Sequence, residues 1–158
     1  MMSGETSMGF NKLPIPVKIK LFENAKIPEY KTSGSVCADC YCNLASDYIL
    51  IPPFDKVKIP LGFALEIPEG YKVVVEPRSS LLQDKSGLNV HGEIDTDYRG
   101  QLMASVINLD PIHNMEILNG ERVCQISIVP VYKMEFVQVN ELSSTERGEG
   151  GFGSTGAS

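Results

Sequence analysis

Apolar and polar residues alternate in several short stretches of this chain, which is the pattern of β-strands with one buried face. The alternation is clear at 14–21 and 62–67, and 71–76 contains a run of three valines, which is typical of a strand. Further strands are expected at 36–44, 48–51, 57–59, 101–109 and 123–132, whereas 115–118 is too short to assign. One short helix is expected at 79–85. Many short strands separated by proline and glycine predict an all-β sandwich or barrel.

Length and composition are those of one globular domain. The chain has 158 residues, of which 42% are hydrophobic and 22% are charged. A net charge of −6 argues against a general nucleic-acid binder, although local arginines can hold a small anion in an acidic protein. No apolar run reaches the about 18 residues of a membrane-spanning helix, and the polar start does not resemble a signal peptide. We therefore expect a soluble cytoplasmic protein without nucleic-acid or membrane partners.

Three regions are expected along the chain. Residues 1–12 are polar and predicted to be disordered, residues 13–142 form the all-β domain, and residues 143–158 form a mobile tail rich in glycine. Glycines let backbone N–H groups approach phosphate oxygens, and Ser154 and Thr155 would add donors. Arg147 could pair with a phosphate, and Phe152 could stack on a planar base. The tail is either a flexible low-complexity end or a lid that becomes ordered over a ligand.

The four cysteines admit a metal or redox interpretation and a structural one. Cys37 and Cys40 form a C-x-x-C pair, and Cys42 and Cys124 are the other two. A zinc site needs a second pair of ligands, and the rest of the chain offers none with suitable spacing. On a strand, Cys40 and Cys42 would share one face. We therefore expect small, buried strand residues in thiol form.

The stretch N-V-H-G-E-I-D-T-D-Y-R-G at 89–100 combines two carboxylates with a tyrosine and an arginine. If 89–105 is a tight hairpin, Asp95 and Asp97 point to one side of a strand and Ile94 to the other. Two acidic side chains beside the hydroxyl of Tyr98 suit a site that activates water and binds a small ligand. The alternative is a solvated turn rich in charge.

Two further turns could hold an anion. The segment P-R-S-S-L at 77–81 follows a strand and offers Arg78, two hydroxyls and backbone N–H groups. The alternative is that Ser79 or Ser80 is the N-cap of a short helix. In G-E-R-V-C-Q-I at 120–126, alternation would direct Arg122 and Cys124 to one face and Val123 and Gln125 to the other.

Five segments in a fixed order make this chain resemble the trimeric deoxyuridine triphosphate nucleotidohydrolases (dUTPases). The resemblance extends from about Val17 to the end of the chain. The most specific segments are P-R-S-S-L, I-D-T-D-Y-R-G and R-G-E-G-G-F-G-S-T-G. The five segments are 35–42, 77–81, 92–100, 120–126 and 147–156. The resemblance implies a distorted jelly-roll subunit that assembles as a homotrimer, with active sites shared among the chains and each closed by a tail.

The activity implied by the resemblance is hydrolysis of dUTP to dUMP and pyrophosphate with Mg²⁺, which limits uracil in DNA and supplies dUMP for thymidylate synthesis. Asp95 would orient and deprotonate the water that attacks the α-phosphorus, and Tyr98 would pack on the deoxyribose and exclude a 2′-hydroxyl. Asp39 would support the metal and its water network from a distance. The other implied substrate contacts are Arg78, Ser79, Ser80, Gln125 and Arg147 on phosphates, Asn89 and the backbone of Glu93 and Ile94 on uracil, Met103 near the nucleotide, and Phe152, Gly153, Ser154 and Thr155 in the tail.

The chain departs from the family pattern in three places. The first segment, usually A-G-x-D-L, reads V-C-A-D-C around Asp39. The stretch between Arg78 and Asp95 is about two residues shorter than the common bacterial pattern. His91 and Glu93 occupy places usually filled by apolar or small residues.

Two alternative functions remain open from the sequence. A dCTP deaminase, or a bifunctional deaminase–diphosphatase of the same superfamily, would use Glu93 as its general base. A non-catalytic nucleotide-sensing module would keep the fold and use the tail as a switch for a partner. Ammonia release from dCTP would identify the first, and tight dUTP binding without turnover would identify the second.

Overall fold

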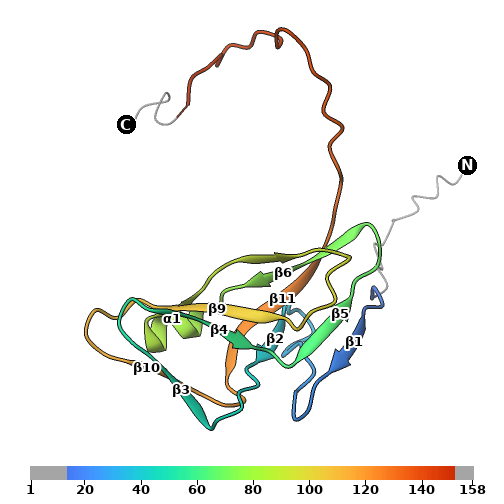
Figure 1. Cartoon of the computed structure of the whole chain (residues 1–158). Coiled ribbons are helices and arrows are strands. Elements are labelled where there is room, and N and C mark those ends of the chain that lie inside the picture. Colours follow the sequence, from blue (N-terminus) through green and yellow to red (C-terminus); the bar gives the residue numbers. More distant parts are fainter. Residues whose placement is uncertain (1–13, 152–158) are drawn as a thin grey trace, which may run out of the picture.

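The computed structural model describes residues 14–151, and its regular elements are almost all β-strands (Figure 1). The elements are β1 (Lys18–Leu21), β2 (Ala38–Tyr41), β3 (Tyr48–Ile51), β4 (Lys56–Pro60), β5 (Phe63–Glu66), β6 (Tyr71–Glu76), α1 (Ser79–Lys85), β7 (Gly87–Asn89), β8 (Gly92–Ile94), β9 (Met103–Asn108), β10 (Met115–Leu118) and β11 (Arg122–Pro130). The prediction of an all-β, jelly-roll-like subunit with one short helix is therefore confirmed.

The strands pair antiparallel in four small sheets. The largest has the order β2-β11-β6-β8, and a three-stranded sheet has the order β4-β9-β7. The pairs β1-β5 and β10-β3 form two further sheets. Strand β11 is central, because it pairs with β2 on one side and with β6 on the other. Neighbours in these sheets are distant in sequence, so the site residues come together only when the whole domain folds.

The core lies between the sheets, and the expected alternation appears where a strand has one buried face. On β9, Ala104, Val106 and Asn108 are buried and the intervening residues are partly exposed. Asn108 is a polar member of the core, and its Nδ2 donates to the carbonyl oxygens of Ile51 and His113, both at 2.9 Å. These bonds satisfy the buried amide and join β9 to its neighbours.

Gly62 is a position where the turn between β4 and β5 requires glycine. Its φ is +76°, a conformation that side chains disfavour. An added Cβ would lie 2.5 Å from the Cβ of Ala25 and 2.8 Å from the Cβ of Asn43. Glycine is therefore required at residue 62 both by the backbone conformation and by the close approach of two other segments.

Residues 115–118, which were too short to assign from the sequence, form β10, whose partner β3 lies more than sixty residues earlier in the chain. Two sequence predictions differ from the structure. The segment 89–105 is not a tight hairpin, because β7 pairs with β9 whereas β8 leaves it to pair with β6. Strand β8 ends at Ile94, so Asp95 and Asp97 lie in a turn and not on one face of a strand.

The alternation predicted at 120–126 is also wrong. The register of β11 against β2 shifts between Arg122 and Cys124, and both Val123 and Cys124 are fully buried. The shift leaves Arg122 free to turn towards β2, where it meets Asp39.

The cysteines behave largely as the structural interpretation predicts. Cys40, Cys42 and Cys124 are buried, and Cys37 is partly exposed. Cys40 lies directly opposite Cys124, and the neighbouring Cys124 thiol, together with burial, raises the pKa of Cys40. The Cys40 thiol therefore stays protonated, and the buried cysteines pack as small core residues.

Residues 131–151, which we call the C-terminal segment, contain no helix or strand. The segment leaves the end of β11 and runs away from the sheets (Figure 1). Its apolar side chains are exposed, including Tyr132 at 92%, Phe136 at 86% and Leu142 at 88%. Side chains of this kind are normally covered in a folded assembly.

Candidate active site

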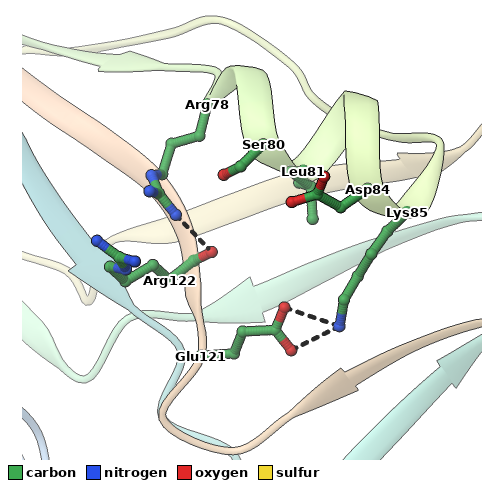
Figure 2. A pocket seen from close by; sticks show the side chains of 7 residues that line it. All are labelled: Arg78, Ser80, Leu81, Asp84, Lys85, Glu121 and Arg122. Atoms are coloured by element: carbon green, nitrogen blue, oxygen red, sulfur yellow. Dashed lines mark hydrogen bonds and ion pairs between the residues drawn. The ribbon is translucent and has the colours of Figure 1, made fainter.

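Asp39 joins two arginines from different parts of the chain. Its Oδ1 lies 3.0 Å from Nε of Arg78, and its Oδ2 lies 3.0 Å from Nη1 of Arg122. Asp39 is only 8% exposed, so these charge-assisted bonds are shielded from water. Nη1 of Arg78 also donates to the carbonyl oxygen of Arg122 at 3.2 Å (Figure 2). One carboxylate and two guanidiniums leave a net positive charge at this point, which suits an anionic ligand.

Helix α1 begins immediately after this cluster. Arg78 is its N-cap residue, with extended backbone angles and no side-chain capping hydrogen bond. Neither Ser79 nor Ser80 is therefore the N-cap residue, in contrast to the alternative considered from the sequence. Ser80 faces an open cavity of about 190 Å³ that Arg78 and Arg122 also line (Figure 2). Ser80, Arg78 and Arg122 therefore border the same space.

The far end of α1 is tied to the turn before β11. Nζ of Lys85 lies 2.7 Å from each carboxylate oxygen of Glu121, and it donates to the carbonyl oxygen of Glu116 at 2.7 Å. Figure 2 shows this ion pair on the opposite side of the same cavity from Arg78. Both ends of α1 are thus fixed to the β10–β11 region, which holds the serines in place.

Gln125 lies directly opposite Asp39 in the pairing of β11 with β2. It lines an open cavity of about 200 Å³ together with Asp39, Cys37 and Lys31. Nε2 of Gln125 donates to the carbonyl oxygen of Pro77 at 3.0 Å, which connects β11 to the segment before α1. Burial raises the pKa of Cys37, so its thiol is neutral in this cavity. The predicted phosphate contacts Arg78, Ser80 and Gln125 are therefore close together.

A second group of predicted residues surrounds a different cavity, of about 290 Å³. It contains Asp95, Tyr98 and Met103, with Glu93 and Ile94 from β8. Lys58 on β4 also lines it, opposite Ser105 on β9. Asp95 is exposed, and the turn that carries it is closed by a hydrogen bond from the N–H of Tyr98 to the carbonyl oxygen of Asp95, at 3.2 Å. An exposed carboxylate, an aromatic ring and an apolar floor define a site for a small polar ligand.

Asn89 ends β7, and it is 1% exposed. Its Nδ2 donates to the carbonyl oxygen of Val90 at 3.1 Å. In the part of the chain that the structure describes, its Oδ1 is the one buried side-chain oxygen or nitrogen without a hydrogen-bond partner. An unsatisfied buried acceptor costs about 1–3 kcal/mol, so a ligand that donates to it would recover that free energy.

The two groups of residues do not share a cavity. The cavities at Arg78 and Gln125 and the cavity at Asp95 have no lining residue in common. Arg147 lies in the C-terminal segment, where its Nε donates to the carbonyl oxygen of Gly150 at 2.7 Å. The remaining predicted tail contacts, Phe152, Gly153, Ser154 and Thr155, lie outside the described residues.

Glu93 and His91 take part in a group of ionisable side chains on and next to β6 and β8. Nζ of Lys72 lies 2.6 Å from Oε1 of Glu93, and this hydrogen bond lowers the pKa of Glu93. Nδ1 of His91 lies 3.5 Å from Oε2 of Glu76, and its Nε2 lies 3.8 Å from Oε1 of Glu93. A carboxylate held ionised by a lysine is a weak proton acceptor, which disfavours Glu93 as a general base.

Sequence reasoning missed two residues of these clusters. Arg122 was assigned to a strand face without a role, and only the shift in register brings it to Asp39. Lys58 gave no signal beyond its place in an alternating K-V-K stretch, and its position beside Asp95 follows from the pairing of β4 with β9.

Comparison with known proteins places the chain in one family. The dUTPase family model matches residues 23–156. The chain is 46% identical to the deoxyuridine 5'-triphosphate nucleotidohydrolase of Hydrogenobaculum sp. (strain Y04AAS1), over 87% of this chain and 94% of that protein. It is 45% identical to the enzyme of the same name from Treponema denticola, over 87% of this chain and 95% of that protein.

A solved structure agrees with these matches. The dUTPase of Staphylococcus bacteriophage 80alpha with dUpNHpp superposes with a TM-score of 0.78, at 29% identity, and the match covers 90% of this chain and 99% of that one. Fold and site together define an all-β enzyme subunit with a positively charged cluster and a separate carboxylate cavity. The chain belongs to the dUTPase family.

Proposed function

We propose that this chain is a dUTP diphosphatase, which hydrolyses dUTP to dUMP and pyrophosphate and so limits uracil in DNA and supplies dUMP. The family membership supports this activity, and the observation that carries it is the cavity that Asp95, Tyr98 and Met103 line together. Asp95 orients the attacking water and takes its proton, and Tyr98 packs on the deoxyribose. Hydrolysis of a polyphosphate needs such a held water and neutralised phosphate charge.

Base selection rests on Asn89 and the backbone of Glu93 and Ile94. The unpartnered Oδ1 of Asn89 accepts the N3–H of uracil, which removes the cost of leaving that oxygen buried alone. Cytosine has no hydrogen on N3 and would leave the acceptor unsatisfied. A site built around such a bond rejects the wrong base strongly.

The triphosphate lies on the positive cluster, where Arg78, Ser79, Ser80 and Gln125 contact its oxygens. Mg²⁺ would neutralise the triphosphate charge. Residues 14–151 contain no group of three His, Cys, Asp or Glu side chains able to hold a metal, so the ion would be held mainly by phosphate oxygens and water. Both oxygens of Asp39 face guanidiniums, so its support of the ion would pass through water.

The active unit is a homotrimer in which each site combines residues from different copies. The separation of the Arg78 cluster from the Asp95 cavity within one copy supports this arrangement. The exposed apolar side chains of the C-terminal segment support it too, because contact with a second copy would cover them. The tail then brings Arg147, Phe152, Gly153, Ser154 and Thr155 to a site formed by other copies.

Product analysis tests the activity. The chain is incubated with Mg²⁺ and dUTP, dCTP, dTTP or UTP, and monophosphate, pyrophosphate and ammonia are quantified. Pyrophosphate from dUTP alone is expected. Ammonia from dCTP would instead identify a deaminase, and tight dUTP binding without any product would identify a nucleotide sensor.

Mixing of two inactive variants tests the shared site. Asp95→Asn and Arg78→Ala are each expected to be inactive alone. After random reassembly of equal amounts, about a quarter of the sites in a homotrimer combine an intact Asp95 with an intact Arg78. Recovery of about that fraction of wild-type activity is expected. No recovery, with mixed trimers shown by mass spectrometry, would contradict the proposed arrangement.

A further inference from the structure

Gly100 is covered so closely by the ring of Tyr98 that no side chain fits there. A Cβ added at Gly100 would overlap Oη of Tyr98, and it would lie 2.6 Å from Cζ and 3.0 Å from Cε2. Non-bonded carbon atoms prefer separations of about 3.5–4.0 Å. The phenol therefore rests directly on the Cα of Gly100.

The backbone does not explain this glycine. The described glycines with positive φ are Gly62, Gly70, Gly120 and Gly148, so Gly100 has a conformation that alanine can adopt. The three atoms nearest to a Cβ at this position all belong to the Tyr98 side chain, so we attribute the need for glycine at residue 100 to the Tyr98 ring and not to the turn.

The position of the ring is fixed from a second direction. Oη of Tyr98 donates to the carbonyl oxygen of Gln101 at 3.0 Å, which holds the phenol back over its own turn. Tyr98 lines the Asp95 cavity, whereas Gly100, beneath the ring, does not. The Tyr98 ring forms one wall of this cavity. It can occupy its position only because residue 100 has no side chain.

We propose that Gly100 determines selectivity for the sugar, because it seats the Tyr98 ring where a ribose 2′-hydroxyl would otherwise fit. This inference rests on the proposed function, in which Tyr98 packs on the deoxyribose. The atoms that a Cβ would displace are at the far end of a side chain that is 44% exposed. The ring can therefore move at little cost to the stability of the fold. We expect Gly100→Ala to reduce selectivity for the sugar and to leave stability unchanged.

The experiment compares Gly100→Ala with Gly34→Ala and Tyr98→Phe. Gly34 is a matched control, because its φ is not positive and an added Cβ meets nothing within 4 Å. The ratio of kcat/KM for dUTP to that for UTP is measured for each variant, with the thermal midpoint. A pocket that rejects an analogue with one added hydroxyl discriminates by about 100-fold. Gly100→Ala should therefore lower the ratio by about tenfold or more at an unchanged midpoint. Gly34→Ala should keep the ratio, and Tyr98→Phe, which keeps the ring, should lower it less than Gly100→Ala does.

A crystal structure of nucleotide-free Gly100→Ala supplies a readout that needs no activity. The ring of Tyr98 is expected to leave its position over residue 100. An unchanged ratio, including one that results from an equal loss for dUTP and UTP, or an unmoved ring would overturn the inference. If the wild type hydrolysed neither nucleotide, the proposed function would fail, and the ring position would still decide whether Gly100 seats Tyr98.

Discussion

Replacement of Asp39 by asparagine removes one charge and almost no volume from the positive cluster. The side chains of Asp39 and Arg78 are only 11% and 16% exposed, so the change leaves a guanidinium shielded from water without its counter-charge. Breaking a buried ion pair costs about 3–5 kcal/mol. Arg122 is 43% exposed and partly screened, and asparagine still accepts one hydrogen bond, so we expect a loss of about 2–3 kcal/mol in the free energy of unfolding.

Urea unfolding at fixed protein concentration measures this loss, because assembly would otherwise change the apparent stability. For a chain of this size the loss corresponds to a fall in the thermal midpoint of about 4–12 °C. Glu29→Gln is the matched control, since it makes the same chemical change in an exposed ion pair with Lys31 and should have little effect. If Asp39→Asn proved as harmless as Glu29→Gln, the buried cluster would not be a source of stability.

Three further results are expected. Asp95→Asn should keep dUTP affinity and lose most hydrolysis, and unchanged turnover would exclude Asp95 as the base. Deletion of residues 147–158 should reduce hydrolysis by about tenfold or more at an unchanged thermal midpoint, whereas a large fall in the midpoint would contradict the role of a lid. Gly62→Ala should destabilise the fold by about 2 kcal/mol or more, as measured by thermal unfolding, because it combines a positive φ with overlap against Ala25 and Asn43.

The fold was predictable where the local sequence of an element has a clear pattern. The three valines of β6 are all buried, as a β-branched run suggests, and the single helix has the expected bounds, Ser79–Lys85. Strand β10 was missed because four residues give too short a pattern and its partner β3 is remote. The departure of β8 from the expected hairpin depends on pairing with β6, which no local pattern encodes.

The identity of many candidate site residues was predictable from the sequence. The contacts that these residues make with one another were less predictable. The ordered segments identified Arg78, Asp95 and Tyr98, each of which lines a cavity. The pairing of Arg122 with Asp39 could not be predicted from the sequence. It depends on a shift in the register of β11 against β2 between Arg122 and Cys124, and this shift breaks the regular alternation of faces. The contact between Tyr98 and Gly100 was likewise hidden, since it depends on which way a ring folds over its own turn.

The C-terminal segment also affects the fate of a copy that has not yet assembled, because it determines whether proteases and chaperones can act on that copy. Tyr132, Phe136 and Leu142 lie open on an extended backbone, which is the kind of chain that proteases cleave and chaperones bind. In the proposed trimer these side chains would be covered. Unassembled copies would then be removed selectively, and the amount of protein that survives would follow the amount that has found its partners.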